Sequence, residues 1–186
     1  MKELQDYGGA FNRNIQLQDC SKELLVQLIK TYSRFYMALD GFWYLSIMDR
    51  INEKTAIDCD LNVWDKQSKY EIKRISKLLN IEGKDITSFL KCFQFFFWNW
   101  NLEYQIQLND NDSGIWTVFK CPTMESLERE GKGRDNYHCA LVEAKIFNIF
   151  VQNFNPDIQV RYIKLPPRLN NDDIFCQWEF KIKKVV

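Results

Sequence analysis

The sequence has no excess of either charge, and it contains little glycine, proline or histidine. Lysine and arginine number 25, aspartate and glutamate also number 25, and the isoelectric point is about 6.6. Because nucleic-acid-binding domains carry a basic patch or surplus, this balance argues against a nucleic-acid partner. With 7 glycines and 4 prolines among 186 residues, and 15% aromatic residues, the composition is typical of a packed, helix-rich domain and not of a disordered chain.

No apolar run is long enough to cross a bilayer. The longest, residues 35–48, contains Asp40 and is shorter than the roughly 20 residues that a spanning helix needs. The N-terminal stretch MKELQDYGGAFNRN lacks the apolar core of a signal peptide. These absences predict a cytoplasmic protein with no membrane partner, whose 6 cysteines are reduced thiols and not disulfides.

The beginning of the chain leads into a long helical pattern. Residues 1–20 show no period and are expected to form an arm, after which Asp19 or Ser21 is placed to cap a helix. Gly41 interrupts this helix and leaves two alternatives, close helix packing or room for a ligand beside Trp43. The apolar residues of the helix follow three-four spacing on two adjoining stripes, which predicts a largely buried helix: Leu25, Leu28, Ile29, Tyr32, Phe35, Tyr36, Leu39, Phe42, Trp43 and Ile47.

Two further helices are predicted in the first half of the chain. Asn52 caps the second helix, which is expected to end at Gly83. The third begins at Lys84 or Asp85 and is expected to continue through the run FQFFFWNW to Trp100. Such an aromatic run is too apolar to face solvent, so it is expected in the core, with an apolar cavity or a dimer interface as alternatives.

The period changes from helical to alternating at Leu102. The alternation predicts four strands, at 102–108, 115–120, 158–162 and 174–182. The segment NDNDSG is expected to turn between the first two. Two hairpins flanking helices, after an all-helical half, predict an α+β fold with one four-stranded antiparallel sheet in the order strand-strand-helix-helix-strand-strand. We therefore treat residues 21–186 as one domain, helical at 21–101 and sheet-containing at 102–186.

Chemically capable side chains gather around Cys121 and Cys139. We expect Cys121 and Cys176 to lie near each other at one end of the sheet. The single histidine, His138, precedes Cys139 at a helix start, where the helix dipole lowers a thiol pKa. Three interpretations stay open: the thiols are small core residues, they border a ligand pocket, or they join His138 or Asp60 as catalytic groups. Thiolate and imidazole are also the usual zinc ligands, which makes Cys121, His138, Cys139 and Cys176 candidate metal ligands, although no C-x-x-C or H-x-x-x-H spacing occurs.

The loop from Glu128 to His138 combines Gly131 and Gly133 with several charged residues. Its backbone N–H groups and the Arg134 guanidinium suit a ligand's carboxylate or phosphate, although the loop matches neither a P-loop nor a dinucleotide fingerprint. It is either the mobile lip of a pocket or an ordinary solvated connection. The candidate ligand-binding residues are Trp43, Trp64, Cys121, Arg134, Cys139, Cys176 and Trp178.

Several short motifs resemble a known family. They are LDGFWYLSIMDR, the helical set Ala56, Asp60 and Trp64, the pair Cys121-Pro122, Cys139, and the C-terminal set Cys176, Trp178 and Phe180. From about Leu24 onward the chain resembles an uncharacterised family of small prokaryotic cytosolic proteins. Its C-terminal half is similar to the vinyl-reductase-type small-molecule-binding domain and to the aminothiazoline-carboxylate hydrolase family. The resemblance implies a helical layer on a four-stranded antiparallel sheet, with a pocket whose rim carries the cysteines.

Three functions are therefore expected as alternatives. The first is binding of a small, partly apolar molecule, with an acidic group as one option, in a pocket between the helices and the sheet. The second is a thiol- or metal-dependent hydrolase that acts on a small compound with C–N or C–S bonds, with zinc as the candidate cofactor. The third is a homodimeric interaction module that pairs through the aromatic third helix or an exposed edge of the sheet.

Overall fold

A computed structural model describes residues 3–110 and 112–183 of the chain. Within these residues, α1 (Lys22–Arg50), α2 (Glu53–Leu78) and α3 (Ile86–Phe93) precede the first hairpin, as predicted. The later elements are β1 (Glu103–Asp110), β2 (Ser113–Lys120), α4 (Pro122–Glu130), α5 (Ala144–Phe154), β3 (Ile158–Lys164) and β4 (Cys176–Ile182). The predicted α+β fold and element order are confirmed, while Asn111 of the predicted turn lies outside the described residues.

The sheet has the order β1-β2-β4-β3, and every neighbouring pair is antiparallel. Along β2, Trp116 and Val118 are buried, whereas Ile115 and Thr117 are only half-buried and Phe119 is exposed. Trp116 and Val118 therefore provide the core face of this strand. On β4 the predicted inward alternation holds, because Cys176, Trp178 and Phe180 are all buried.

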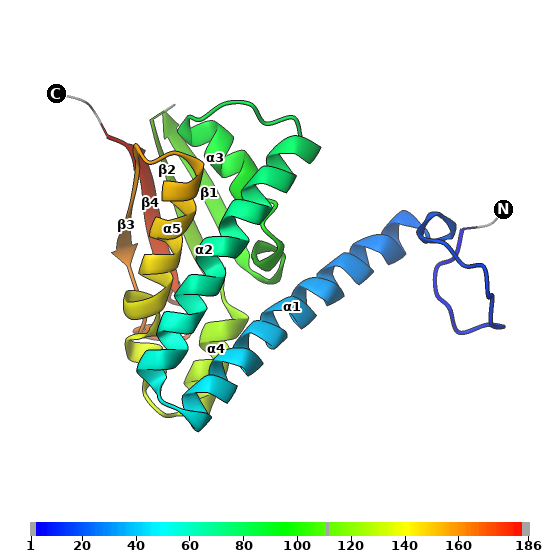
Figure 1. The fold of residues 1–186 in the computed structure, drawn as a ribbon, viewed down its shortest axis with the longest axis horizontal. Helices are drawn as coiled ribbons and strands as arrows, with labels where there is room; N and C mark the ends of the chain where they lie inside the picture. The colour runs from blue at the N-terminus through cyan, green and yellow to red at the C-terminus, as the bar shows by residue number, and fades with distance from the viewer. Residues whose placement is uncertain (1–2, 111, 184–186) are drawn as a thin grey trace.

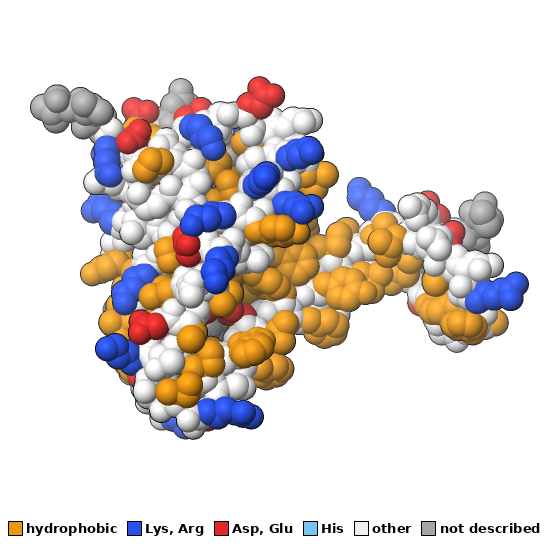
Figure 2. Space-filling view, in the orientation of Figure 1, with side chains coloured by type: hydrophobic (Ala, Val, Ile, Leu, Met, Phe, Trp, Pro, Cys, Tyr) orange, Lys and Arg blue, Asp and Glu red, His pale blue; other side chains and the backbone are white. Residues whose placement is uncertain are grey.

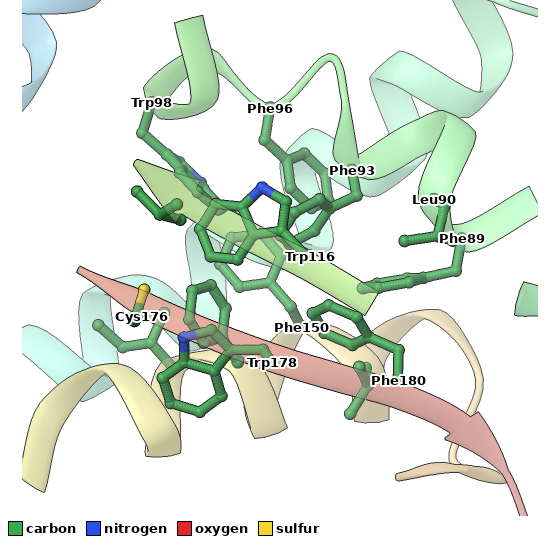
Figure 3. Close-up of a cluster of buried hydrophobic side chains, with 14 of the residues drawn as sticks. Phe89, Leu90, Phe93, Phe96, Trp98, Trp116, Phe150, Cys176, Trp178 and Phe180 are labelled. Carbon is green, nitrogen blue, oxygen red and sulfur yellow. The ribbon is translucent and has the colours of Figure 1, made fainter. Parts of the chain in front are cut away.

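Helices cover the apolar face of the sheet (Figure 1). α3 and α5 pack against the strands, and α2 packs across α5. The ring of Phe93, on α3, lies 5.2 to 5.3 Å from the rings of Trp98, Trp116 and Phe180, measured between centroids, in the aromatic cluster of Figure 3. Phe93, Phe96 and Trp98 of the aromatic run are thus part of the core, whereas Phe95 is exposed. α3 has no large apolar surface left for a dimer interface.

The ends of the first helices are set by local side-chain contacts. Ser21, Asn52 and Asp85 cap α1, α2 and α3, because each side chain accepts a hydrogen bond from the backbone N–H three residues ahead. α2 ends earlier than predicted: Asn80 adopts a left-handed φ of 52°, so the helix stops before Gly83 is reached.

α3 is also shorter than predicted, since it does not continue to Trp100. The chain turns after Phe93 and then forms a separate 3-10 helix, η2 (Phe97–Asn101). The buried side chain of Asn99 donates a 2.9 Å hydrogen bond to the carbonyl oxygen of Phe93 and holds the two segments together. The spacing of apolar residues could not reveal this break, because aromatic residues would occupy every face of a helix built from the run FQFFFWNW.

α1 departs most from expectation. Figure 1 shows its C-terminal half against the rest of the domain and its N-terminal half projecting away. Of its 29 residues only Ser33 and Tyr44 are buried, and Ser33 hydrogen-bonds to the carbonyl oxygen of Phe97. The prediction of a largely buried helix is wrong, because one of its two apolar stripes has no cover among the described residues.

The arm before α1 has few contacts with the domain. Residues 3–20 contain one short 3-10 helix, Leu17–Asp19, and a parallel bridge between Leu4 and Cys20. Figure 1 shows this segment at the far end of α1. None of the helices within residues 3–110 and 112–183 has both the length and the hydrophobicity needed to cross a bilayer.

Candidate functional site

A cavity of about 460 Å³ lies between the helices and the apolar face of the sheet. Its wall is built from α1, α2, η2, β2, α4, α5 and β4, together with the segment between α4 and α5. A volume of this order is within the range of small-molecule sites. Elements from both halves of the sequence therefore converge on one cavity, which is partly open to solvent.

Tryptophan side chains form much of the apolar wall. Trp98 of η2 and Trp116 of β2 are 8% and 2% exposed, and their indole nitrogens have no hydrogen-bond partner among the described atoms. Trp178 pairs with Trp116 in the register of β4 and β2. Its indole nitrogen also lacks a hydrogen-bond partner among the described atoms, although it lies near the thiol of Cys176, a weak acceptor (Figure 3). An unpaired buried donor costs roughly 1–3 kcal/mol, so an acceptor atom in the cavity would stabilise this wall.

Carboxyl groups from three different elements border the same cavity. They are Asp40 of α1, Asp60 of α2 and Glu143, which precedes α5. Burial, followed by the negative charges of Asp40 and Glu143, raises the pKa of Asp60 to about 8. Burial, followed by the charge of Glu143, raises the pKa of Asp40 to about 6, while His138 lowers it. The three carboxyl groups are thus close enough to repel one another when ionised.

A π-helical turn aims Glu143 at this cluster. The turn, η4 (Cys139–Glu143), runs directly into α5, and residues at both of its ends border the cavity. His138 Nε2 lies 3.7 Å from Glu143 Oε1, and the His138 ring packs edge-on against Tyr44. π-helical turns are rare and occur frequently at functional sites. The sequence contained no signal for Glu143, since its orientation depends on the widened turn.

The predicted cysteines do converge here, but as protonated thiols. Cys121, Cys139 and Cys176 all border the cavity, and Cys139 Sγ lies 3.5 Å from Met124 Sδ. Burial raises the pKa of Cys121 to about 12 and also raises those of Cys139 and Cys176. The expectation that the helix dipole lowers the pKa of Cys139 is wrong, because burial outweighs the dipole. Thiols in this state are poor nucleophiles at neutral pH.

The predicted metal site is not formed in the part of the chain that the structure describes. Within residues 3–110 and 112–183, no group of three or more histidine, cysteine, aspartate or glutamate side chains is arranged to hold a metal ion. Cys121, His138, Cys139 and Cys176 share the cavity wall without forming a ligand set.

Arg134 borders the cavity, but its charge is already paired. Its guanidinium Nη2 lies 2.7 Å from Glu130 Oε2, and its Nε donates to the same oxygen. Gly131 and Gly133 adopt left-handed φ angles of 67° and 79°, which bring the chain around so that Arg134 is buried near the ring of Tyr44. Holding a ligand's acidic group with Arg134 would therefore compete with Glu130.

Of the other predicted ligand-binding residues, two border the cavity and one does not. Trp64 and Trp178 border the cavity, and the Trp64 indole lowers the pKa of Asp60 through a hydrogen bond. Trp43 is 64% exposed and lies outside the cavity wall. The structure thus adds Asp40 and Glu143 to the candidate site and leaves Trp43 outside it.

Comparison with known proteins gives a family but no activity. No curated protein and no solved structure matches the chain. The similarity to the vinyl-reductase-type domain and to the aminothiazoline-carboxylate hydrolases therefore stays a prediction. One family model matches residues 18–182, which takes in every α-helix and strand described above. The chain belongs to this family, DUF6125, a family of unknown function.

Proposed function

We propose that this protein binds a small, largely apolar molecule that carries a basic nitrogen. The observation that carries the proposal is the placement of Asp40, Asp60 and Glu143 around a cavity with tryptophan in its wall. A protonated amine among these carboxyl groups would pair with their ionised forms and relieve their mutual repulsion. Aromatic faces attract cations as well, which adds to the preference.

The buried carboxyl groups around the cavity favour a cation over an anion, although the exposed Arg34 also borders it. Asp40 and Asp60 form no ion pair with a lysine or arginine among the described residues, whereas Arg134 is paired with Glu130. An acidic ligand would add a further negative charge beside the carboxyl cluster. A basic ligand is therefore the better match than the acidic one that the loop sequence had left as an option.

The tryptophan wall favours a hydrogen-bond acceptor. The indole N–H groups of Trp98 and Trp116 require an acceptor, which a carbonyl, ether or hydroxyl oxygen supplies. The ligand class is thus an apolar body with one amine and one neutral oxygen acceptor. The cavity volume of about 460 Å³ admits a molecule of a few rings at most.

A thermal-shift screen with matched probes tests the proposal. The panel contains 2-phenylethylamine, 2-phenylethanol and 3-phenylpropanoate, which share a phenyl group and a short alkyl chain but differ in charge. We expect the amine to raise the Tm most at pH 8, because the carboxyl groups are then substantially ionised. A larger response to 3-phenylpropanoate would make the proposal wrong.

Two variants separate the cavity from other buried acids. Asp60→Asn removes a cavity carboxyl and should abolish most of the amine response. Glu71→Gln is the matched control, because Glu71 is a buried carboxyl with a pKa raised to about 7 by burial but lies outside the cavity wall. Equal loss in both variants would show that the response does not come from this site.

Hydrolysis is a second candidate, favoured by the separation of two carboxyl pKa values. At neutral pH Asp60 is mostly protonated and can donate a proton, while Asp40 is mostly ionised and can accept one. The thiol-dependent form of the prediction has no such support, because the three thiols stay protonated. Mass spectrometry of small aromatic amides incubated with the protein tests this candidate: turnover that is lost in both Asp40→Asn and Asp60→Asn would favour it over binding alone.

A further inference from the structure

α1 carries an apolar stripe that the rest of the chain leaves largely exposed. We call it the α1 seam, and its members are Leu25, Leu28, Tyr32, Phe35, Leu39 and Phe42. The last four are 54%, 61%, 58% and 67% exposed. Figure 2 shows hydrophobic side chains gathered along this helix. Large apolar side chains in such a continuous row are unusual on a surface that stays in water.

Most of the seam is separate from the side of α1 that contacts the domain, and Phe42 at its end reaches the cavity wall. Ser33 and Tyr44 are buried and mark the contacting side. With 3.6 residues per turn, the centre of the seam lies roughly 140° around the helix from that side. The helices of the same chain therefore cannot cover the seam while α1 keeps its present contacts.

The spacing of the seam matches a two-helix coiled coil. Its members follow steps of three, four, three, four and three residues, which is the seven-residue repeat of residues that interlock between paired helices. From Leu25 to Phe42 the seam extends over roughly 26 Å at 1.5 Å per residue. The surface that fits such a row is another helix with the same repeat, and a second copy of α1 has it.

The residues beside the seam also permit pairing of identical helices. The flanking positions hold no charged side chain: Ile29, Thr31, Tyr36 and Ala38 within the seam, and Trp43 directly after it. Two like chains can therefore meet without like-charge repulsion, and nothing at these positions selects a differently charged partner.

The area available is close to that of a stable interface. The three seam aromatics and Trp43 are each more than half exposed, and an aromatic side chain covers about 150–250 Å² when fully buried. With the leucines, pairing would cover on the order of 600 Å² per copy, near the roughly 800 Å² per partner of a standard interface.

We propose that this protein forms a homodimer in which the α1 seams of two copies pack against each other as a coiled coil. The pairing covers the projecting half of α1, which a single copy leaves in water. Phe42 belongs both to the seam and to the cavity wall, so the second copy lies beside the rim of the candidate site. The interface is thus on α1, and not on the buried α3 or an edge of the sheet, the two surfaces that the sequence had suggested.

Light scattering on the full-length chain tests the dimer. At tens of micromolar, the parent should have twice the monomer mass of 22.3 kDa. Phe35→Glu and Leu39→Glu each place a charge in the seam and should give the monomer mass. Gln27→Glu is the matched control, since it adds the same charge at an exposed position of α1 outside the seam and should remain dimeric.

Two further measurements separate loss of the dimer from loss of the fold. Near-UV circular dichroism checks that the variants keep the folded domain, which is expected because the substituted positions are exposed. Hydrogen exchange on the parent needs no variant: amides 25–35 should exchange more slowly in concentrated than in dilute protein. A parent that stays at 22.3 kDa, or a dimer that survives both glutamate substitutions, would overturn the proposal. Co-sedimentation of a monomeric parent with phosphatidylglycerol vesicles would assign the seam to a lipid surface and overturn it too.

Discussion

Asp60 on α2 and Asp40 on α1 border the same cavity, and the negative charge of Asp40 adds to burial in raising the pKa of Asp60 to about 8. At neutral pH one of these carboxyl groups is therefore mostly protonated and the other mostly ionised. Because these buried carboxyl groups must ionise close to one another at alkaline pH, they reduce the stability of the protein there unless a bound cation neutralises them.

Stability should fall as the pH rises from 5 to 9. The folded-state pKa values of Asp60 and Glu71, about 8 and about 7, lie above their ordinary values, so the folded protein binds more protons than the unfolded chain. Their contribution is complete below the ordinary carboxyl pKa, and it is lost as the pH passes through 7 and 8. Thermal denaturation followed by circular dichroism at several pH values measures this.

Asp60→Asn should remove its share of this pH dependence. The amide is neutral at every pH, so the variant should have a Tm a few degrees above the parent at pH 8.5, at roughly 2–4 °C per kcal/mol. The two proteins should converge toward pH 5. A parent Tm that is constant or rises between pH 5 and 8.5 would contradict the assignment of raised pKa values.

The cysteines should differ sharply in reactivity. At pH 7, iodoacetamide should label Cys59 first, because its side chain is exposed. Cys121, Cys139 and Cys176 should stay unlabelled in the folded protein, since burial keeps them protonated. Peptide mass spectrometry after short exposure measures the order. Fast labelling of any of these three would contradict this expectation and would support the hypothesis of a thiol-dependent hydrolase.

Two glycines should respond in opposite ways to alanine. A Cβ on Gly41 meets no atom within 4 Å, so Gly41→Ala should stabilise α1 by about 0.5–1 kcal/mol. A Cβ on Gly114 would lie 2.6 Å from Cδ1 of buried Leu90, so Gly114→Ala should destabilise the protein by about 1–3 kcal/mol. Urea denaturation of both variants measures the changes, and a stabilised Gly114→Ala would show that the core is looser than described.

The architecture could be predicted because its signals are local. The change of hydrophobic period at Leu102 marks where helices give way to strands. The helix caps at Ser21, Asn52 and Asp85 depend only on a hydrogen bond that each side chain accepts from the backbone N–H three residues later. The extent of α1 burial could not be predicted in the same way. A stripe of apolar residues identifies the side of a helix that avoids water, but not the surface that covers it.

The candidate site was predicted only in part, for a related reason. Strand ends bring Cys121 and Cys176 together at one end of the sheet, which follows from alternation and hairpin connectivity. Asp40 lies on a helix, where carboxylates are usually solvated, and its burial depends on how α1 packs. Glu143 reaches the cavity through a π-helical turn, which has no recognisable sequence signal.

The most direct test of the account is calorimetric titration of 2-phenylethylamine into the parent protein at pH 6 and pH 8.5. The amine stays protonated at both values, while Asp60 changes from mostly neutral to mostly ionised because its pKa is about 8. We predict binding about tenfold or more tighter at pH 8.5, with proton release near pH 7.5 that is absent in Asp60→Asn. An affinity that does not change with pH, or no binding at either pH, would contradict the proposal that these carboxyl groups recognise a basic ligand.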